Sequence, residues 1–239
     1  MIIEDIISTL DMDAGVREIR QGIFYTGVQS RHCGLAATLI QDALQQGAPL
    51  VKSPGSLLAS RTFDLVQLAY SERIAEAAIG MATINSLVEI DATACVERNA
   101  GDLIMEKGQG RRVVVIGHFP FIPDVRKVAG HLSVIDQNPK THALPVSETE
   151  RRVPQADVLA ITGTAFTNHT LEHLLALKNP KAFVVILGGT APMTPILFDY
   201  GIHAICGTQV VNPRLALQCI SQGANFRQIR GTRRLTLMR

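Results

Sequence analysis

The stretch Asp157 to Leu177, DVLAITGTAFTNHTLEHLLAL, decides the fold of this chain. It begins with the apolar run Val158 to Ile161, turns through small polar residues and ends with leucines near helical spacing. A buried strand, a tight turn and a helix over 168–177 are therefore expected. Free backbone N–H groups and the positive end of a helix dipole meet at such a turn, so the pattern predicts a ligand-binding position there.

Strands and helices alternate on both sides of this stretch. Apolar strands are expected at 112–116, 132–136, 182–187 and 202–206, and helices at 124–129, 194–200 and 212–221. Near-continuous apolar strands are typical of a parallel sheet with helices on both faces. The sequence therefore predicts an α/β fold, a Rossmann-like doubly wound parallel sheet over 111–239. A final edge strand around Leu235 and Leu237, with solvated arginines, is expected to complete it.

The N-terminal part has a different pattern. A short amphipathic helix is expected at 2–10, strands between Val16 and Leu39, a loop at 47–55, and helices at 63–70 and 72–88. Strands followed by helices predict a small α+β domain over 1–90. Residues 91–110 then form a connecting segment with one short helix, and 138–154 a loop or broken helix.

Glycine and threonine follow the predicted parallel strands. In such sheets ligands bind beyond the carboxyl ends of the strands, and glycine lets a ligand approach the backbone. Tight turns alone could also explain these glycines. A second polar cluster, Ser30 and Arg31, lies between the expected N-terminal strands. Together with it, the predicted ligand-binding residues are Gly117, Thr162, Gly163, Thr164, Asn168, Gly188, Gly189, Thr190, Gly207, Ser30 and Arg31.

Two residues are predicted to be catalytic. His118 directly follows the first parallel strand and can act as a general acid or base, or as a metal ligand. Its alternative role is that of a turn histidine bonded to the backbone. Asn85 lies in the otherwise apolar or small helix GMATINSL, where a buried amide must find partners. It is expected either at the cleft between the domains or as a tie between helix and loop.

Metal and cofactor motifs are sparse. His169 and His173 stand four residues apart, which places them on one face of the expected helix, but no third ligand lies nearby. The four cysteines form no CxxC pair, and Cys33 could be a thiolate only beside a base or positive charge. No GxGxxG follows the first parallel strand, so the usual NAD or FAD fingerprint is absent. A divalent metal is one candidate cofactor, and its ligands are unknown.

Composition restricts the class of protein. Hydrophobic residues make up 46% and charged residues 18% of 239 residues, and no apolar run has the length of a membrane helix. The acidic N-terminus has no signal-peptide layout, so a soluble cytoplasmic protein is expected. Five arginines in the last fourteen residues account for the formal net charge of +2, and solvated strand residues explain them better than nucleic-acid binding. A homodimer is the expected assembly.

Several stretches resemble a prokaryotic family of uncharacterised proteins labelled "putative heavy-metal chelation". They are VVVIGHFPFIP (113–123), DVLAITGTAFTNHTLEHLL (157–175), VVILGGTAPMTPILFDYGI (184–202), YTGVQ (25–29), GLAATL (34–39) and GMATINSL (80–87). The resemblance implies an enolase-N-terminal-like domain followed by a Rossmann-like domain, with a cleft between them. It also implies partial similarity to Rossmann-like methyltransferases. Asp136, at the end of the second expected parallel strand, is the one candidate by position for an acidic ribose anchor.

Three functions follow as hypotheses. The first is an enzyme that acts on a small anionic metabolite, by condensation or hydrolysis in the metabolism of a pterin-, flavin- or siderophore-like chelator. The second is a binding protein that sequesters a metal or metal chelate, with His118, His32, Cys33 and Asp136 as candidate ligands. The third is an S-adenosylmethionine binder of the methyltransferase type.

Overall fold

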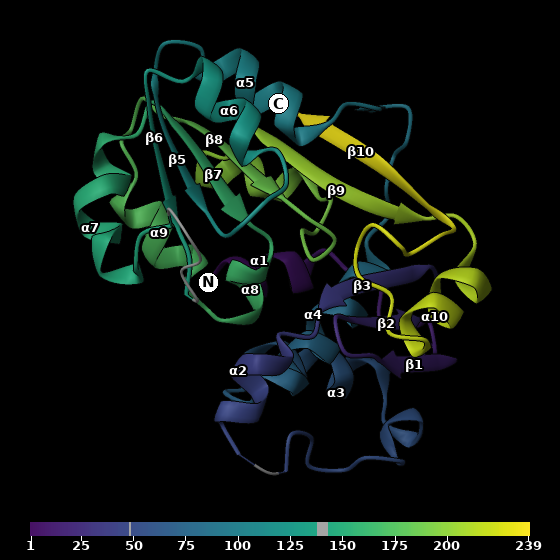
Figure 1. Cartoon of the computed structure of the whole chain (residues 1–239). Helices are drawn as coiled ribbons and strands as arrows, with labels where there is room; N and C mark the ends of the chain where they lie inside the picture. Colours follow the sequence, from purple (N-terminus) through teal and green to yellow (C-terminus); the bar gives the residue numbers. More distant parts are fainter. Residues whose placement is uncertain (48, 138–142) are drawn as a thin grey trace.

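Two β-sheets organise the chain in the computed structural model, which describes residues 1–47, 49–137 and 143–239 (Figure 1). The smaller sheet is antiparallel, in the order β1 (Glu18–Gln21), β2 (Tyr25–Gln29), β3 (Cys33–Ala37). The larger sheet has the order β4 (Cys95–Val96), β10 (Thr232–Met238), β9 (Ala204–Val210), β8 (Phe183–Leu187), β7 (Val158–Thr162), β5 (Arg112–Ile116), β6 (His131–Ile135).

Helices surround both sheets. The α-helices are α1 (Ile2–Ser8), α2 (Ile40–Gln45), α3 (Thr62–Gln67), α4 (Ile74–Leu87), α5 (Ala100–Gly108), α6 (Ile122–Val128), α7 (Thr149–Arg152), α8 (Thr164–Thr167), α9 (Leu171–Leu177) and α10 (Pro213–Ser221). The 3₁₀ helices are η1 (Leu57–Ala59), η2 (Leu68–Tyr70), η3 (Val146–Glu148), η4 (Val153–Gln155) and η5 (Pro195–Tyr200). In the described ranges, no helix is both long and apolar enough to cross a membrane.

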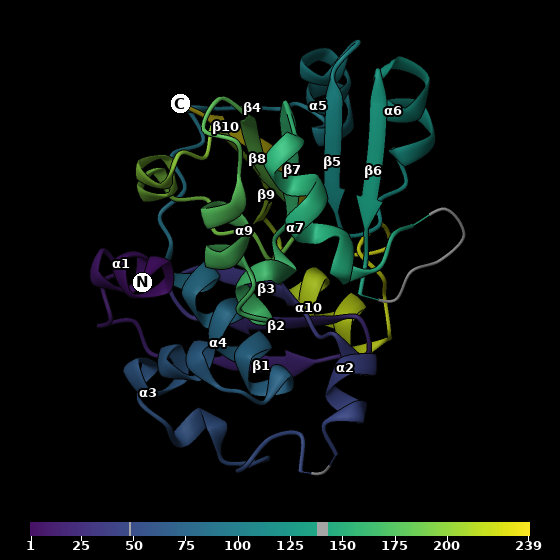
Figure 2. The ribbon, with the colours of Figure 1, turned by 90° about the vertical axis from the view of Figure 1, so that its left-hand side faces the viewer.

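The parallel part of the larger sheet confirms the predicted fold class. The strands β6, β5, β7, β8 and β9 pair in parallel in that order, and their apolar residues are buried on both faces. From β5 the chain moves first to β6 on one side and then to β7 on the other. The strand order therefore reverses between β5 and β7, and such a switch point is where open α/β sheets bind ligands. In Figure 2 the arrowheads of β5 and β6 point toward the small sheet.

One apolar core joins the two sheets. Buried residues of α4 and the small sheet, such as Met81 and Val28, belong to the same cluster as Leu159, Ile161 and Ile205 of the large sheet. The opposite face of the large sheet packs against α5 and α6 through a separate cluster. The carboxyl ends of the parallel strands therefore face a small sheet that is packed against them.

Helix α4 is the centre of the N-terminal part. Most of its own residues are apolar or small, and all of them except Asn85 are buried. It packs against β2 and β3 on one side and against α3 and η2 on the other. The carboxylate of its buried Glu76 accepts hydrogen bonds from Lys52 N at 2.8 Å and from the Ser71 hydroxyl at 2.6 Å. A helix that is apolar on every side requires partners on every side, and the fold supplies them.

Several elements differ from the sequence expectation. The helix predicted over 168–177 begins later than expected, at Leu171, because His169 has a φ of 58° and lies outside any helix. A separate short helix, α8, precedes the predicted range. The segment 195–200 is a 3₁₀ helix. The strand expected at 202–206 runs on to Val210, so Gly207 lies inside β9 rather than in a loop.

The chain ends also pair differently. β10 is not the edge strand that was expected, because β4 pairs with its last residues. β4 belongs to the segment that was expected only to connect the domains. Helix α10 leaves the large sheet and packs on β1 and β2 (Figure 1). The boundaries at 90 and 110 stay predictions, and residues 138–142 of the expected loop at 138–154 lie outside the described residues, as does residue 48 of the loop at 47–55.

Candidate functional site

A cavity of about 660 Å³ lies at the carboxyl ends of the parallel strands. Its lining residues come from β2, the loops after β5, β7 and β8, helix α6, strands β9 and β10 and the segments 98–100 and 225–227. They are Tyr25, Arg98, Asn99, Ala100, His118, Phe119, Pro120, Phe121, Asp124, Thr162, Gly163, Thr164, Leu187, Gly188, Gly189, Thr190, Cys206, Gly207, Asn225, Phe226, Arg227, Arg234 and Leu235. Eight of the residues predicted from sequence are among them, so the structure brings most of the predicted site together.

Glycine residues allow the sharp turns at the ends of the parallel strands. Gly117 and Gly188 have φ values of 100° and 115°, a region that side chains other than glycine rarely adopt. Gly163 N donates to Leu187 O at 2.8 Å, and Gly188 N donates to Cys206 O at 3.0 Å. At least two of the backbone N–H groups that were expected to be free at these turns therefore form hydrogen bonds with a neighbouring strand and are not available to a ligand. Helix α8, only four residues long, also contributes little dipole.

His118 lies at the switch point, directly after Gly117. Its side chain is exposed and lines the cavity. In the described part of the chain it makes no hydrogen bond and no ion pair, so the alternative of a turn histidine bonded to the backbone is not seen. An imidazole in this position is available to exchange a proton with a ligand.

Aromatic rings line two sides of the cavity. Tyr25 and Phe226 are stacked with centroids 5.6 Å apart, and Phe119 and Phe121 with centroids 5.2 Å apart. The first pair lies directly on Gly189, where an added Cβ would be 3.0 Å from both rings. Burial raises the pKa of Tyr25, an effect that Arg234 and a hydrogen bond with the Gly189 backbone partly offset. These walls suit a planar, partly apolar ligand.

Three arginines reach the cavity, and sequence reasoning did not assign them to it. Arg98 is paired with Glu106, whereas Arg227 and Arg234 have no carboxylate partner among the described residues. The Arg234 guanidinium lies 5.2 Å from the centroid of the Phe226 ring. The cluster of arginines near the C-terminus was visible in the sequence, but an alternating strand pattern gives no indication of what its polar side faces.

Asn85 does not line the cavity, but it forms a hydrogen bond with Thr190, a residue of the cavity wall. Its Nδ2 donates to Leu35 O at 2.8 Å and to Thr190 O at 3.0 Å, while Ala37 N donates to the Thr190 hydroxyl at 2.9 Å. These bonds tie α4 and β3 to the loop after β8. These bonds are those that the second expected role, a tie between helix and loop, requires, whereas Asn85 Oδ1 is buried without a hydrogen-bond partner among the described residues.

Replacing Asn85 with alanine is expected to lower the free energy of unfolding by about 2 kcal/mol, because two hydrogen bonds are lost and two carbonyls lose a donor. The melting temperature should fall by roughly 4–8 °C for a protein of this size. Urea and thermal unfolding measure the change. Asn179→Ala is the matched control, since the Asn179 side chain only accepts a bond from Lys181 N in an exposed turn. Equal stability of the two variants would contradict this role.

Other predicted residues lie away from the cavity. The Ser30 hydroxyl is 2.5 Å from the Ser86 hydroxyl and is buried, and Arg31 is paired with Asp11 and Glu89. Asn168 follows α8 and its side chain contacts the Thr170 hydroxyl at 2.7 Å. None of these three residues belongs to the cavity wall. Gly117 shapes the turn before His118 but is not itself part of the lining.

The candidate metal ligands do not form a cluster in the described residues. Within the described ranges, no group of three or more histidine, cysteine, aspartate or glutamate side chains could hold a metal ion. Burial, with a smaller contribution from Glu18, raises the pKa of Cys33 to about 12, so this thiol is neutral at physiological pH. His169 precedes α9 and His173 lies within it, so the expectation that they share a helix face is wrong. Asp136 follows β6 but does not line the cavity.

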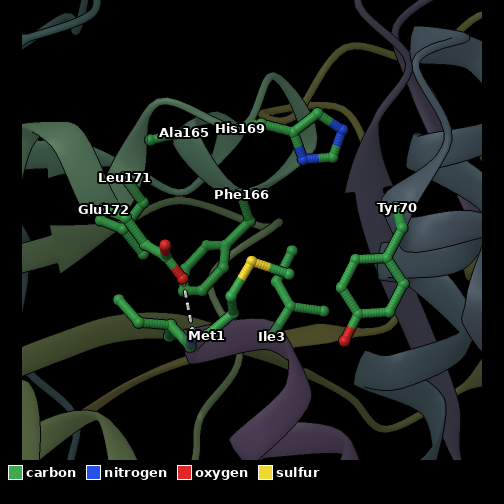
Figure 3. Close-up of a pocket in the computed structure, with 9 residues that line it drawn as sticks. Met1, Ile3, Tyr70, Ala165, Phe166, His169, Leu171 and Glu172 are labelled. Carbon is green, nitrogen blue, oxygen red and sulfur yellow. Dashed lines mark hydrogen bonds between the residues drawn. The ribbon is translucent and has the colours of Figure 1, made fainter.

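A second cavity of about 270 Å³ lies between α1, η2 and the α8–α9 segment (Figure 3). Figure 3 shows Tyr70 on one side and Glu172 on the other. Ile2 N donates to Glu172 Oε1 at 2.7 Å, and His169 Nε2 lies 3.1 Å from Ser71 O. Its other walls are mostly apolar, and it is smaller and lies away from the carboxyl ends of the parallel strands, so the larger cavity is the candidate site.

Two family models match separate parts of the chain. A family model described as "Putative heavy-metal chelation" (DUF364) matches residues 99–239, and a second model with the same description (DUF4213) matches residues 3–88. An uncharacterised protein of Methanocaldococcus jannaschii is 23% identical over 164 residues, 64% of this chain. The match spans 62% of that relative's length.

Solved structures show the same fold. A DUF364 protein of unknown function from Desulfitobacterium hafniense superposes with a TM-score of 0.87 at 21% identity, covering 100% of this chain and 98% of the other. One from Pyrococcus horikoshii gives a TM-score of 0.85 at 20% identity and the same coverage. Since the first family model matches more than half of the sequence, this chain belongs to the DUF364 family, described as "Putative heavy-metal chelation".

Proposed function

We propose that the protein is an enzyme that acts on a small anionic metabolite in the 660 Å³ cavity. The observation that carries this proposal is the position of His118, which is exposed and unpaired within the described part of the chain and stands at the switch point of the parallel sheet. Proton transfer by a positioned side chain is a common way to promote condensation or hydrolysis. The reaction would belong to the metabolism of a pterin-, flavin- or siderophore-like chelator, which agrees with the family description.

A second candidate function is sequestration of a metal chelate without turnover. The family description favours it, and so do the aromatic walls, which can hold an organic chelator. The described residues contain no cluster of three metal-ligating side chains, which favours a preformed chelate over a bare ion. S-adenosylmethionine binding has less support, because the expected ribose anchor Asp136 is not part of the cavity wall.

Thermal unfolding of chelator-stripped protein tests these functions. One panel contains divalent metals, and the other contains nucleotides, S-adenosylmethionine, pterins and flavins. A ligand at 100 times its dissociation constant adds roughly 2.7 kcal/mol to the free energy of unfolding. At roughly 2–4 °C per kcal/mol, we expect an organic ligand to raise the melting temperature by roughly 5–11 °C. A shift with metals alone would contradict the enzyme proposal, and a shift only with metal and chelator together would favour sequestration.

A further inference from the structure

The segment between α10 and β10 links the two parts of the molecule at the cavity. Helix α10 packs on β1 and β2 through Leu217 and Ile220, whereas β10 pairs with β9 in the large sheet. The connecting residues therefore pass from one sheet to the other along the cavity. Phe226 and Arg227 from this connection, and Arg234 from β10, belong to the cavity wall.

The charged side chains of the cavity wall carry a net positive charge. Arg98 is paired with Glu106, and Asp124 accepts a hydrogen bond from Lys127 Nζ at 2.7 Å. Arg227 and Arg234 have no carboxylate partner among the described residues, and no other acidic side chain lines the cavity. Two positive charges therefore remain for a ligand. The strand-end N–H groups of Gly163 and Gly188 are already bonded, so the arginines are the charged groups of the wall that remain for an anion.

The arginines also stand beside a ring. The Arg234 guanidinium lies over Phe226, and Phe226 is stacked on Tyr25. This contact orients the guanidinium, and an oriented guanidinium can bind two oxygens of one phosphate. The cavity thus combines aromatic walls with two arginines, a combination that fits a planar ring carrying a phosphate group.

We propose that Arg227 and Arg234 bind the phosphate of a phosphorylated planar-ring metabolite and select it against the unphosphorylated compound. This inference rests on the proposed function, since it names the ligand class of the same cavity. It assigns a role to the C-terminal arginines that their strand pattern did not indicate.

Matched ligand pairs test the proposal. Dissociation constants are measured by calorimetry for FMN and riboflavin, for AMP and adenosine, and for pterin-6-carboxylate and pterin. For at least one of the first two rings we expect the phosphorylated member to bind about ten-fold more tightly or better.

Arg227→Gln and Arg234→Gln should each remove most of this preference, and Arg234→Lys should retain part of it. Arg230→Gln is the matched control, because Arg230 is exposed, is in the same connection and does not line the cavity. Circular dichroism verifies that each variant is folded.

Each contrary outcome has a distinct meaning. Equal binding of phosphorylated and unphosphorylated rings would overturn the phosphate proposal while supporting the cavity as a ligand site. A carboxylated pterin that depends equally on both arginines would overturn the selection of phosphate. If neither phosphorylated ring nor inorganic pyrophosphate binds at millimolar concentration, the proposal is also wrong. The metal and S-adenosylmethionine arms of the unfolding screen then still test the proposed function.

Discussion

The variant Gly80→Ala is expected to lose about 3 kcal/mol or more of its free energy of unfolding. A Cβ at this position would be 2.0 Å from Ala69 N and 2.5 Å from Ala69 Cα. Both contacts are with the backbone of η2, so no side chain can rotate away to relieve them. Helix α4 would have to move, and it is buried between β2, β3, α3 and η2. Overpacking of a well-packed core costs roughly 1–3 kcal/mol and sometimes more, and a clash between two backbones is at the upper end.

Urea and thermal unfolding measure this effect. The melting temperature should fall by roughly 6–12 °C relative to the unmodified protein. Gly15→Ala is the matched control, because nothing lies within 4 Å of an added Cβ there. Its stability should stay within about 0.5 kcal/mol of the unmodified protein. Equal stability of the two variants would show that α4 and η2 are not in such close contact.

His118→Ala is expected to lower turnover by about 100-fold or more, because a positioned proton donor or acceptor contributes roughly 10²–10⁴-fold to a rate. Affinity for the ligand that the unfolding screen identifies should change little, since the arginines and aromatic rings are retained. Single-turnover kinetics and equilibrium binding measure the two quantities separately.

His173→Ala is the control for this experiment. His173 is exposed on α9, and its Nε2 lies 3.5 Å from Glu150 Oε1, outside the cavity wall. Both its turnover and its affinity should equal those of the unmodified protein. A loss of affinity that matches the loss of turnover in His118→Ala would instead make His118 a binding residue and favour sequestration.

Local pattern was sufficient to predict much of the fold and the core of the candidate site. The strands β5, β7 and β8 lie within one residue of the expected positions, because each is a short apolar run between turn residues. Their order along the chain already implies that their carboxyl ends share an edge, so His118, Gly163 and Gly189 could be grouped before the structure was known.

Features that depend on contacts distant in sequence could not be predicted. β4 is two residues long and exists because β10, far along the chain, pairs with it. The break at His169 has no glycine or proline to mark it. Ser30 and Arg31 had the composition of a polar site, but Ser86, Asp11 and Glu89 satisfy them.

Apolar runs and turn glycines in the sequence specify the parallel sheet and place His118 at its carboxyl edge, since both signals act over a few neighbouring residues. The partners of Asn85, the docking of α10 on the small sheet and the entry of Arg227 and Arg234 into the cavity follow from packing between segments that are far apart in sequence. Burial and charge pairing select those contacts only once both sheets have formed, and so they are visible in the tertiary structure alone.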